Sequence, residues 1–207
     1  MGVNSTDDLK GKTLGVWFYG NEYPFLSWMS RLGLATDGSA NGVTVLKQGW
    51  GVEPLTEGQA ACVSTMSYNE YWVVRDAGYS PEQLTVFKYQ AEGASTLEDG
   101  LYVLEKNLSD SSFKDKMVRF VRASMKGWKY AEANPKEAAS IILDNDDAGV
   151  QTEKHQVRMM GEIAKLTAGS NGALDPADYQ RTVKVLMSGA SDPVITKEPS
   201  GAWTHDI

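Results

Sequence analysis

The first 95 residues alternate short apolar runs with amphipathic segments, and this order most constrains the fold. The apolar runs have strand length and comprise residues 13–18, 43–46, 60–66 and 84–89. The segments between them are candidate helices, and the first of them places Phe25, Leu26, Met29 and Leu32 at three- and four-residue steps, which is typical of helices. They comprise residues 23–34, 54–59 and 68–77. Strand–helix–strand order with crossovers of this length predicts an α/β fold with a mostly parallel sheet covered by helices.

After residue 95 the pattern becomes helical. One more apolar run, residues 101–104, is the fifth candidate strand. The predicted helices that follow comprise residues 112–134, 135–143, 152–167 and 176–187. Asp175 and Pro176 suit the N-cap and first position of the last of them. Similarly, Gly78 suits the C-terminal cap of helix 68–77.

The first of these later helices has a wide apolar stripe, which comprises Phe113, Phe120, Met125 and Trp128. A large apolar face is rarely left bare. We therefore expect the helices to pack on each other, to rearrange against the α/β segment 8–95, or to bury this face in a homodimer.

Composition favours binding over catalysis. The chain has 20 Lys and Arg against 27 Asp and Glu, a net charge of −7, which argues against a nucleic-acid partner. It has six Trp, nine Tyr and 20 Gly, but two His and one Cys. A single thiol cannot form a disulfide framework or a cysteine zinc site. No cofactor is expected. No apolar run is long enough for a transmembrane helix, and the polar N-terminus shows no signal peptide.

Polar and aromatic side chains follow the first strand, at the edge where parallel sheets bind ligands. Asn21, Glu22 and Tyr23 stand at the start of the predicted helix 23–34. Asn21 could cap that helix, the Glu22 carboxylate could accept hydrogen bonds, and Tyr23 could stack on a flat ring. The alternative is a capped turn with surface aromatic residues.

Two further clusters follow the second and third strands. Trp50, between two glycines, is either a ligand platform or a packed loop anchor. The third strand ends in a polar cluster whose candidate ligand-binding residues are Ser64, Met66, Tyr68, Asn69 and Glu70. The nearby Trp72 is expected in the core. Together the three clusters predict one crevice for a polar aromatic solute.

Catalytic and metal-binding interpretations are weaker. Glu22, Glu70 and Glu92 could form a carboxylate pair for acid–base chemistry, but their spacing does not fix their separation. Cys62 lies within an apolar run and is expected to be a buried small hydrophobe. His155, on a helix, is expected on a solvated face. No catalytic residue and no metal ligand is assigned.

Several motifs resemble those of the NMT1/THI5-like (SsuA/THI5) solute-binding proteins of ABC transporters. The motifs are Asp8-Leu-Lys-Gly-Lys12, Gly20-Asn-Glu-Tyr-Pro-Phe25, Ser64-Thr-Met-Ser-Tyr-Asn-Glu-Tyr71, Thr96-Leu-Glu-Asp-Gly-Leu-Tyr-Val103 and Phe120-Val-Arg-Ala-Ser-Met-Lys-Gly-Trp-Lys-Tyr130. The resemblance implies a periplasmic-binding-protein-like (type II) fold, in which two α/β lobes clamp a solute. The solute class it implies is an aromatic heterocycle, such as a thiamine pyrimidine precursor, or a sulfonate.

The resemblance also implies an ABC permease as partner and a periplasmic or extracellular lipid-anchored location for the full-length form. Family members usually run to roughly 300 residues, a two-domain size. By motif order, residues 8–95 match a complete three-layer α/β second lobe. Residues 96–207 match a crossover strand and the C-terminal helices of the first lobe, whose opening strands are absent. The alternatives are a pyrimidine synthase of the THI5 type, whose cysteine-rich motif this chain lacks, and an inactive fragment.

Overall fold

The computed structural model describes residues 2–188 and 193–207, which form two compact units. The first unit comprises the described residues of 1–98 and 175–200, and the second those of 99–174 and 201–207. The first is mixed α/β with a small parallel sheet, and the second is helical. The expected α/β class is thereby confirmed. The assignment of residues 8–95 and 96–207 to two lobes of a family fold stays a prediction.

The sheet of the first unit has three parallel strands. β1 (Thr13–Val16) lies between β2 (Thr44–Lys47) and β3 (Cys62–Val63). Thr13 is opposite Thr44, and Gly15 is opposite Val63. The predicted parallel sheet is confirmed, and the register brings the carboxyl ends of all three strands to one edge.

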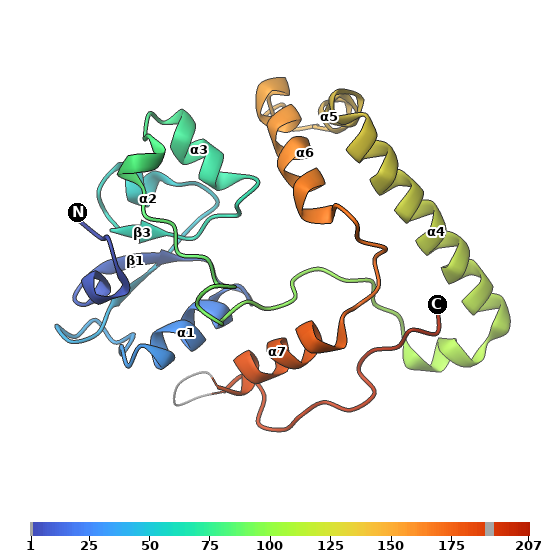
Figure 1. The fold of residues 1–207 in the computed structure, drawn as a ribbon, viewed down its shortest axis with the longest axis horizontal. Helices are drawn as coiled ribbons and strands as arrows, with labels where there is room; N and C mark the ends of the chain where they lie inside the picture. The colour runs from blue at the N-terminus through green and yellow to red at the C-terminus, as the bar shows by residue number, and fades with distance from the viewer. Residues whose placement is uncertain (1, 189–192) are drawn as a thin grey trace. The chain divides into compact units, whose positions relative to one another are not determined.

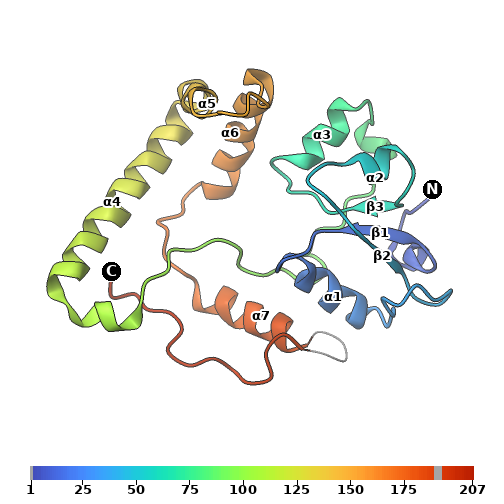
Figure 2. The same cartoon turned by 180° about the vertical axis from the view of Figure 1, so that it is seen from behind.

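Helices cover both faces of this sheet (Figures 1 and 2). α1 (Glu22–Arg31) lies on one side, while α2 (Glu53–Thr56) and α3 (Glu70–Asp76) lie on the other. The face that α1 turns inward carries Phe25, Trp28 and Met29, which share a core with Leu14 and Val16 of β1. Their helical spacing explains why this segment forms a helix on the sheet.

α7 (Pro176–Met187) packs beside α1, where the Ser27 and Ser188 hydroxyl oxygens lie 3.0 Å apart. Its start confirms the sequence prediction, because the Asp175 carboxylate accepts a hydrogen bond from the backbone N–H of Ala177 at 2.7 Å. The predicted end of α3 is confirmed as well. Gly78 follows the last helical turn with φ +103°, a conformation that glycine adopts without strain.

Three expected strands differ from the structure. The run 60–66 shortens to Cys62–Val63, and neither 84–89 nor 101–104 joins the sheet. In the segment 84–94, backbone groups bond within turns, such as the Ala94 N–H to the Tyr89 carbonyl at 2.8 Å. Its aromatic side chains pack on α1 instead: the rings of Phe87 and Tyr89 lie against Trp28, at ring-centroid distances of 5.4 and 6.1 Å. Side-chain packing thus holds the segment against the core without a strand ladder.

The packing of Tyr89 predicts a loss of stability at alkaline pH. Burial raises the pKa of Tyr89 to about 12, and a hydrogen bond with Ser64 offsets part of that effect. An unfolded tyrosine ionises near pH 10, so the folded state keeps its proton longer. The contribution of protonated Tyr89 to the unfolding free energy is complete below about pH 10. As the pH rises toward about 12, the unfolding free energy falls by roughly 2–3 kcal/mol.

Urea unfolding at pH 9 and pH 11 tests this expectation. Tyr89→Phe should show a smaller decrease in unfolding free energy between the two pH values than the unchanged chain. Tyr102→Phe, at a tyrosine whose side chain is 83% exposed, is the control. Equal decreases in the Tyr89→Phe variant and the unchanged chain would contradict the prediction.

The second unit is built from three helices that contact one another. They are α4 (Ser111–Ala133), α5 (Pro135–Asp144) and α6 (Glu153–Thr167). Ala138, Ala139 and Met160 form their small core. The expectation that these helices pack on each other is confirmed. No residue of α4 is fully buried, however, and 54% of Phe120 and 46% of Trp128 remain exposed.

Short 3-10 helices complete the fold, at Thr6–Leu9, Pro81–Gln83 and Glu105–Ser109. Within the described ranges, no helix combines the length and the hydropathy needed to cross a bilayer.

Candidate functional site

Gln48 joins the loops that leave β2 and β3. Its side chain is 5% exposed. The amide nitrogen donates to the carbonyls of Ser64 and Gly51, at 3.0 and 3.1 Å, and the amide oxygen accepts from the Ser64 N–H at 2.8 Å. The amide nitrogen and the amide oxygen of this buried side chain thus both have hydrogen-bond partners, and these partners lie in the two loops. The result is a fixed edge at the carboxyl ends of the strands.

The loop after β1 is tied to the same edge. The Trp17 indole N–H donates to the Gly49 carbonyl at 2.9 Å, which links this loop to the one after β2. Phe18 packs toward the core, whereas Tyr19 points outward and is 90% exposed. Tyr19 has φ +64° and is the one non-glycine residue with positive φ in the part of the chain that the structure describes. Such a conformation costs about 1–2 kcal/mol in a residue with a side chain.

Asn21 does not cap α1. It occupies the N-cap position, but its backbone is helical (φ −83°, ψ −10°), whereas a capping side chain needs an extended backbone there. Its amide instead donates to the Phe18 carbonyl at 3.2 Å. Glu22 accepts from the Gly20 N–H at 2.7 Å and so holds the turn.

Lys47, the last residue of β2, contacts Tyr19. Its ammonium donates to the Tyr19 hydroxyl at 3.0 Å and lies 4.3 Å from the centre of the tyrosine ring. The same ammonium lies 5.4 Å from the Phe18 ring centre. This hydrogen bond and the positive charge lower the pKa of the Tyr19 phenol. The sequence interpretation missed Lys47, although a lysine that ends an apolar run was a visible signal.

Trp50 is 94% exposed. The alternative of a packed loop anchor is therefore wrong for this residue. Trp17 takes the anchoring role, since its indole bonds the carbonyl of Gly49. Trp50 thus presents an open indole in the loop after β2.

In the loop after β3, Glu70 organises the start of α3. Its carboxylate accepts from the Met66 N–H at 2.9 Å and from the Asn69 amide at 2.8 Å. Ser64 continues the ladder, with its N–H 3.0 Å from the Gly15 carbonyl. Trp72, expected in the core, is half-buried and packs edge-on against Tyr71.

The predicted site residues follow the three strands. After β1 come Asn21 in the loop and Glu22 and Tyr23 in the first turn of α1; after β2 comes Trp50; after β3 come Ser64, Met66, Tyr68 and Asn69 in the loop and Glu70 at the start of α3. Direct hydrogen bonds join the second and third loops through Gln48 and the first and second through Trp17. The bonds that Glu22 and Glu70 make are local to their own loops.

The groups considered for catalysis have structural partners. Glu92 accepts a hydrogen bond from the Trp28 indole N–H at 3.0 Å. Cys62 packs against the core but is half-buried, whereas a buried residue was expected. Burial raises the pKa of its thiol to about 11, which disfavours the thiolate. Among the described residues, no cluster of three His, Cys, Asp or Glu side chains is placed to hold a metal ion.

A separate hollow lies in the second unit. Residues 101–104 and α4 line a cavity of about 580 Å³, with Tyr102, Met117 and Phe120 among the lining side chains. None of the predicted site residues lies there.

The sequence matches a known protein family. The model for the family described as NMT1/THI5 like matches residues 1–138. The chain belongs to the NMT1/THI5-like family. The matched range includes β1–β3 and all three loops at their carboxyl ends. This family includes ABC-transporter solute-binding proteins as well as THI5-type enzymes. No curated protein matches the chain.

Proposed function

We propose that this NMT1/THI5-like protein binds a small polar aromatic solute, of the thiamine-pyrimidine-precursor class, as the solute-binding component of an ABC transporter. The observation that carries the proposal is the edge formed by the carboxyl ends of β1–β3. There, Gln48 and Trp17 hold three loops together, and Trp50 and Tyr19 present exposed rings. Rigid loops with open aromatic faces and amide or carboxylate neighbours suit a flat heterocycle.

The wider setting is proposed with it. In a type II periplasmic-binding-protein fold, closure of two lobes would trap the solute, and the closed form would dock on a membrane permease. This setting implies a periplasmic or lipid-anchored protein. The homodimer through the exposed face of α4 stays a prediction, and the exposure of Phe120 and Trp128 supports it.

Binding without chemistry is supported by how the candidate catalytic groups are used. Glu22, Glu70 and Glu92 each accept hydrogen bonds that hold a turn, a helix start or a packed tryptophan. The Cys62 thiol is kept protonated by burial. No observation favours the pyrimidine-synthase alternative over the binding protein.

A ligand panel tests the proposal. Thermal unfolding would be recorded with 4-aminopyrimidine, riboflavin and benzenesulfonate, and titration calorimetry would give the affinity of each compound that raises Tm. Trp50→Ala should weaken binding by about 3- to 10-fold, the value of one lost ring contact. Trp128→Ala, at an exposed tryptophan of the second unit, is the matched control and should leave the affinity unchanged. No Tm increase with any compound would contradict the proposed function.

A further inference from the structure

Lys47 is a cation without an anionic partner at the candidate site. In the described part of the chain, its contacts are the Tyr19 hydroxyl and the rings of Tyr19 and Phe18, and no carboxylate lies within ion-pair distance. A lysine ammonium has three donors, of which the tyrosine takes one. Two donors therefore remain for an acceptor outside the protein.

The Tyr19 backbone holds this ammonium in place. Positive φ at a tyrosine is unfavourable, and such strain gathers where the surrounding structure enforces it for function. Here it turns the Tyr19 ring out of the core, where Phe18 packs, and sets it against Lys47. The long lysine side chain thereby loses freedom before any ligand arrives, which reduces the entropic cost of binding.

One exposed aromatic ring contacts this charge, and a second is exposed three residues further along the chain. Trp50 follows Lys47 by one tight loop, whose Gly49 carbonyl is bonded by Trp17. The Tyr19 ring, 90% exposed, is an open flat surface at the ammonium, and Trp50, 94% exposed, offers a second ring in the loop that follows. A ring stacked on these faces could carry a negative substituent to the two remaining donors of Lys47.

We propose that Lys47 determines ligand specificity at this edge, by selecting an aromatic solute that carries an anionic substituent. The ring stacks on Trp50 or Tyr19, and the carboxylate, sulfonate or phosphate oxygen accepts charge-assisted hydrogen bonds from the Lys47 ammonium. This inference rests on the proposed function and narrows its solute class. The strongest alternative location, the apolar cavity of the second unit, has Lys116 as its one cationic lining residue and carries no such fixed charge.

The test compares benzenesulfonate with its neutral analogue benzenesulfonamide by NMR titration of the full chain. Benzenesulfonate should bind about tenfold more tightly, as one charge-assisted contact provides. Lys47→Gln should abolish that preference, by weakening benzenesulfonate binding about tenfold more than benzenesulfonamide binding. Lys47→Arg should keep most of the preference, since it keeps the charge. Lys10→Gln, at an exposed lysine that follows the 3-10 turn Thr6–Leu9, is the matched control and should behave as the unchanged chain.

The possible outcomes separate the two proposals. Suppose that benzenesulfonamide binds, that Trp50→Ala weakens its binding, and that benzenesulfonate binds with the same affinity. The proposed role of Lys47 is then wrong, and the proposed aromatic site stands. If the preference exists but survives Lys47→Gln, the role of Lys47 is also wrong. If neither compound binds and the panel described above gives no Tm increase, both proposals fail.

Discussion

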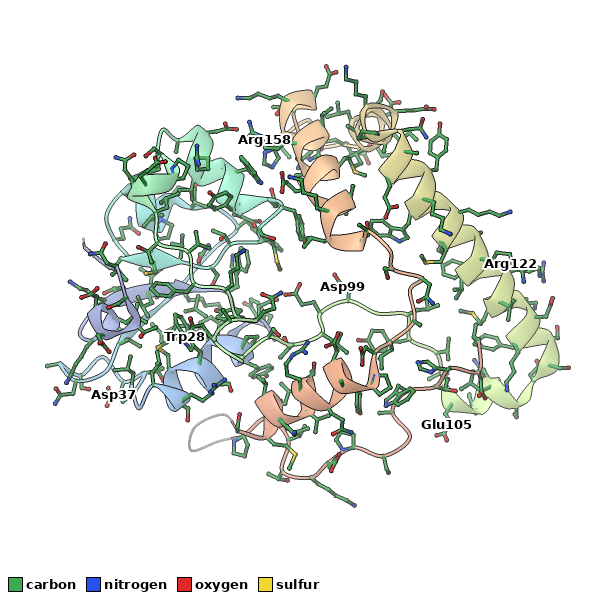
Figure 3. All side chains as sticks on the ribbon, viewed as in Figure 1. Trp28, Asp37, Asp99, Glu105, Arg122 and Arg158 are labelled. Atoms are coloured by element: carbon green, nitrogen blue, oxygen red, sulfur yellow. The ribbon has the colours of Figure 1, made fainter. Side chains whose placement is uncertain are left out.

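Replacement of Trp28 by alanine is expected to lower the free energy of unfolding of the first unit by about 3–5 kcal/mol. Trp28, labelled in Figure 3, lies on α1 and is 6% exposed. It contacts Phe87 and Tyr89 and donates its indole N–H to Glu92. Alanine would leave a cavity and release the segment 84–94, which no strand pairing holds. Total stabilities of about 5–15 kcal/mol make such a loss severe.

Urea unfolding followed by circular dichroism measures this effect. Trp28→Phe separates packing from hydrogen bonding, because it keeps a ring but removes the donor to Glu92, at a cost of about 1–2 kcal/mol. Trp203→Phe, in the second unit, is the matched control. A Trp28→Ala variant that unfolds at the same urea concentration as the unchanged chain would refute this account of the core.

Replacement of Gln48 by methionine is expected to affect both stability and binding. Methionine has a similar length but cannot bond the Ser64 and Gly51 carbonyls, which lose their donor. The lost bonds should reduce the unfolding free energy by about 1–3 kcal/mol. Because the loops after β2 and β3 would no longer be fixed, binding of a ring compound should weaken by about tenfold or more.

The matched control for this variant is Gln59→Met. Gln59 is exposed, and its side-chain amide donates to the Glu57 carboxylate at 2.8 Å. Its replacement should change stability by less than about 0.5 kcal/mol and leave binding unchanged. Calorimetry with 4-aminopyrimidine, together with urea unfolding, measures both quantities. Gln48→Met behaving like Gln59→Met would show that the loops are held by other contacts.

The parallel sheet and its flanking helices could be predicted because their patterns are local. The periodicity of Phe25, Trp28 and Met29 marks the buried face of α1, and Asp175-Pro176 marks the start of α7. The strand at 84–89 was predicted wrongly, because apolar content does not reveal whether a partner edge exists. There, packing of Phe87 and Tyr89 on Trp28 replaced the ladder, a long-range contact that no local pattern encodes.

The candidate site was predictable in position but less so in detail. Strand order placed three loops at one edge, and Trp50 was found from its glycine neighbours. Gln48 and Lys47 were missed because their roles depend on residues in other loops, Ser64 and Tyr19 respectively. The capping role expected of Asn21 depended on backbone angles that residue type alone does not determine.

The central claim is that a solute binds where the loops after β1, β2 and β3 meet. Backbone amide NMR of the isotope-labelled chain, titrated with 4-aminopyrimidine and with benzenesulfonate, tests it most directly. The account predicts chemical-shift changes concentrated in residues 17–23, 47–51 and 64–70. Changes confined to residues 101–120, which line the cavity of the second unit, would contradict it.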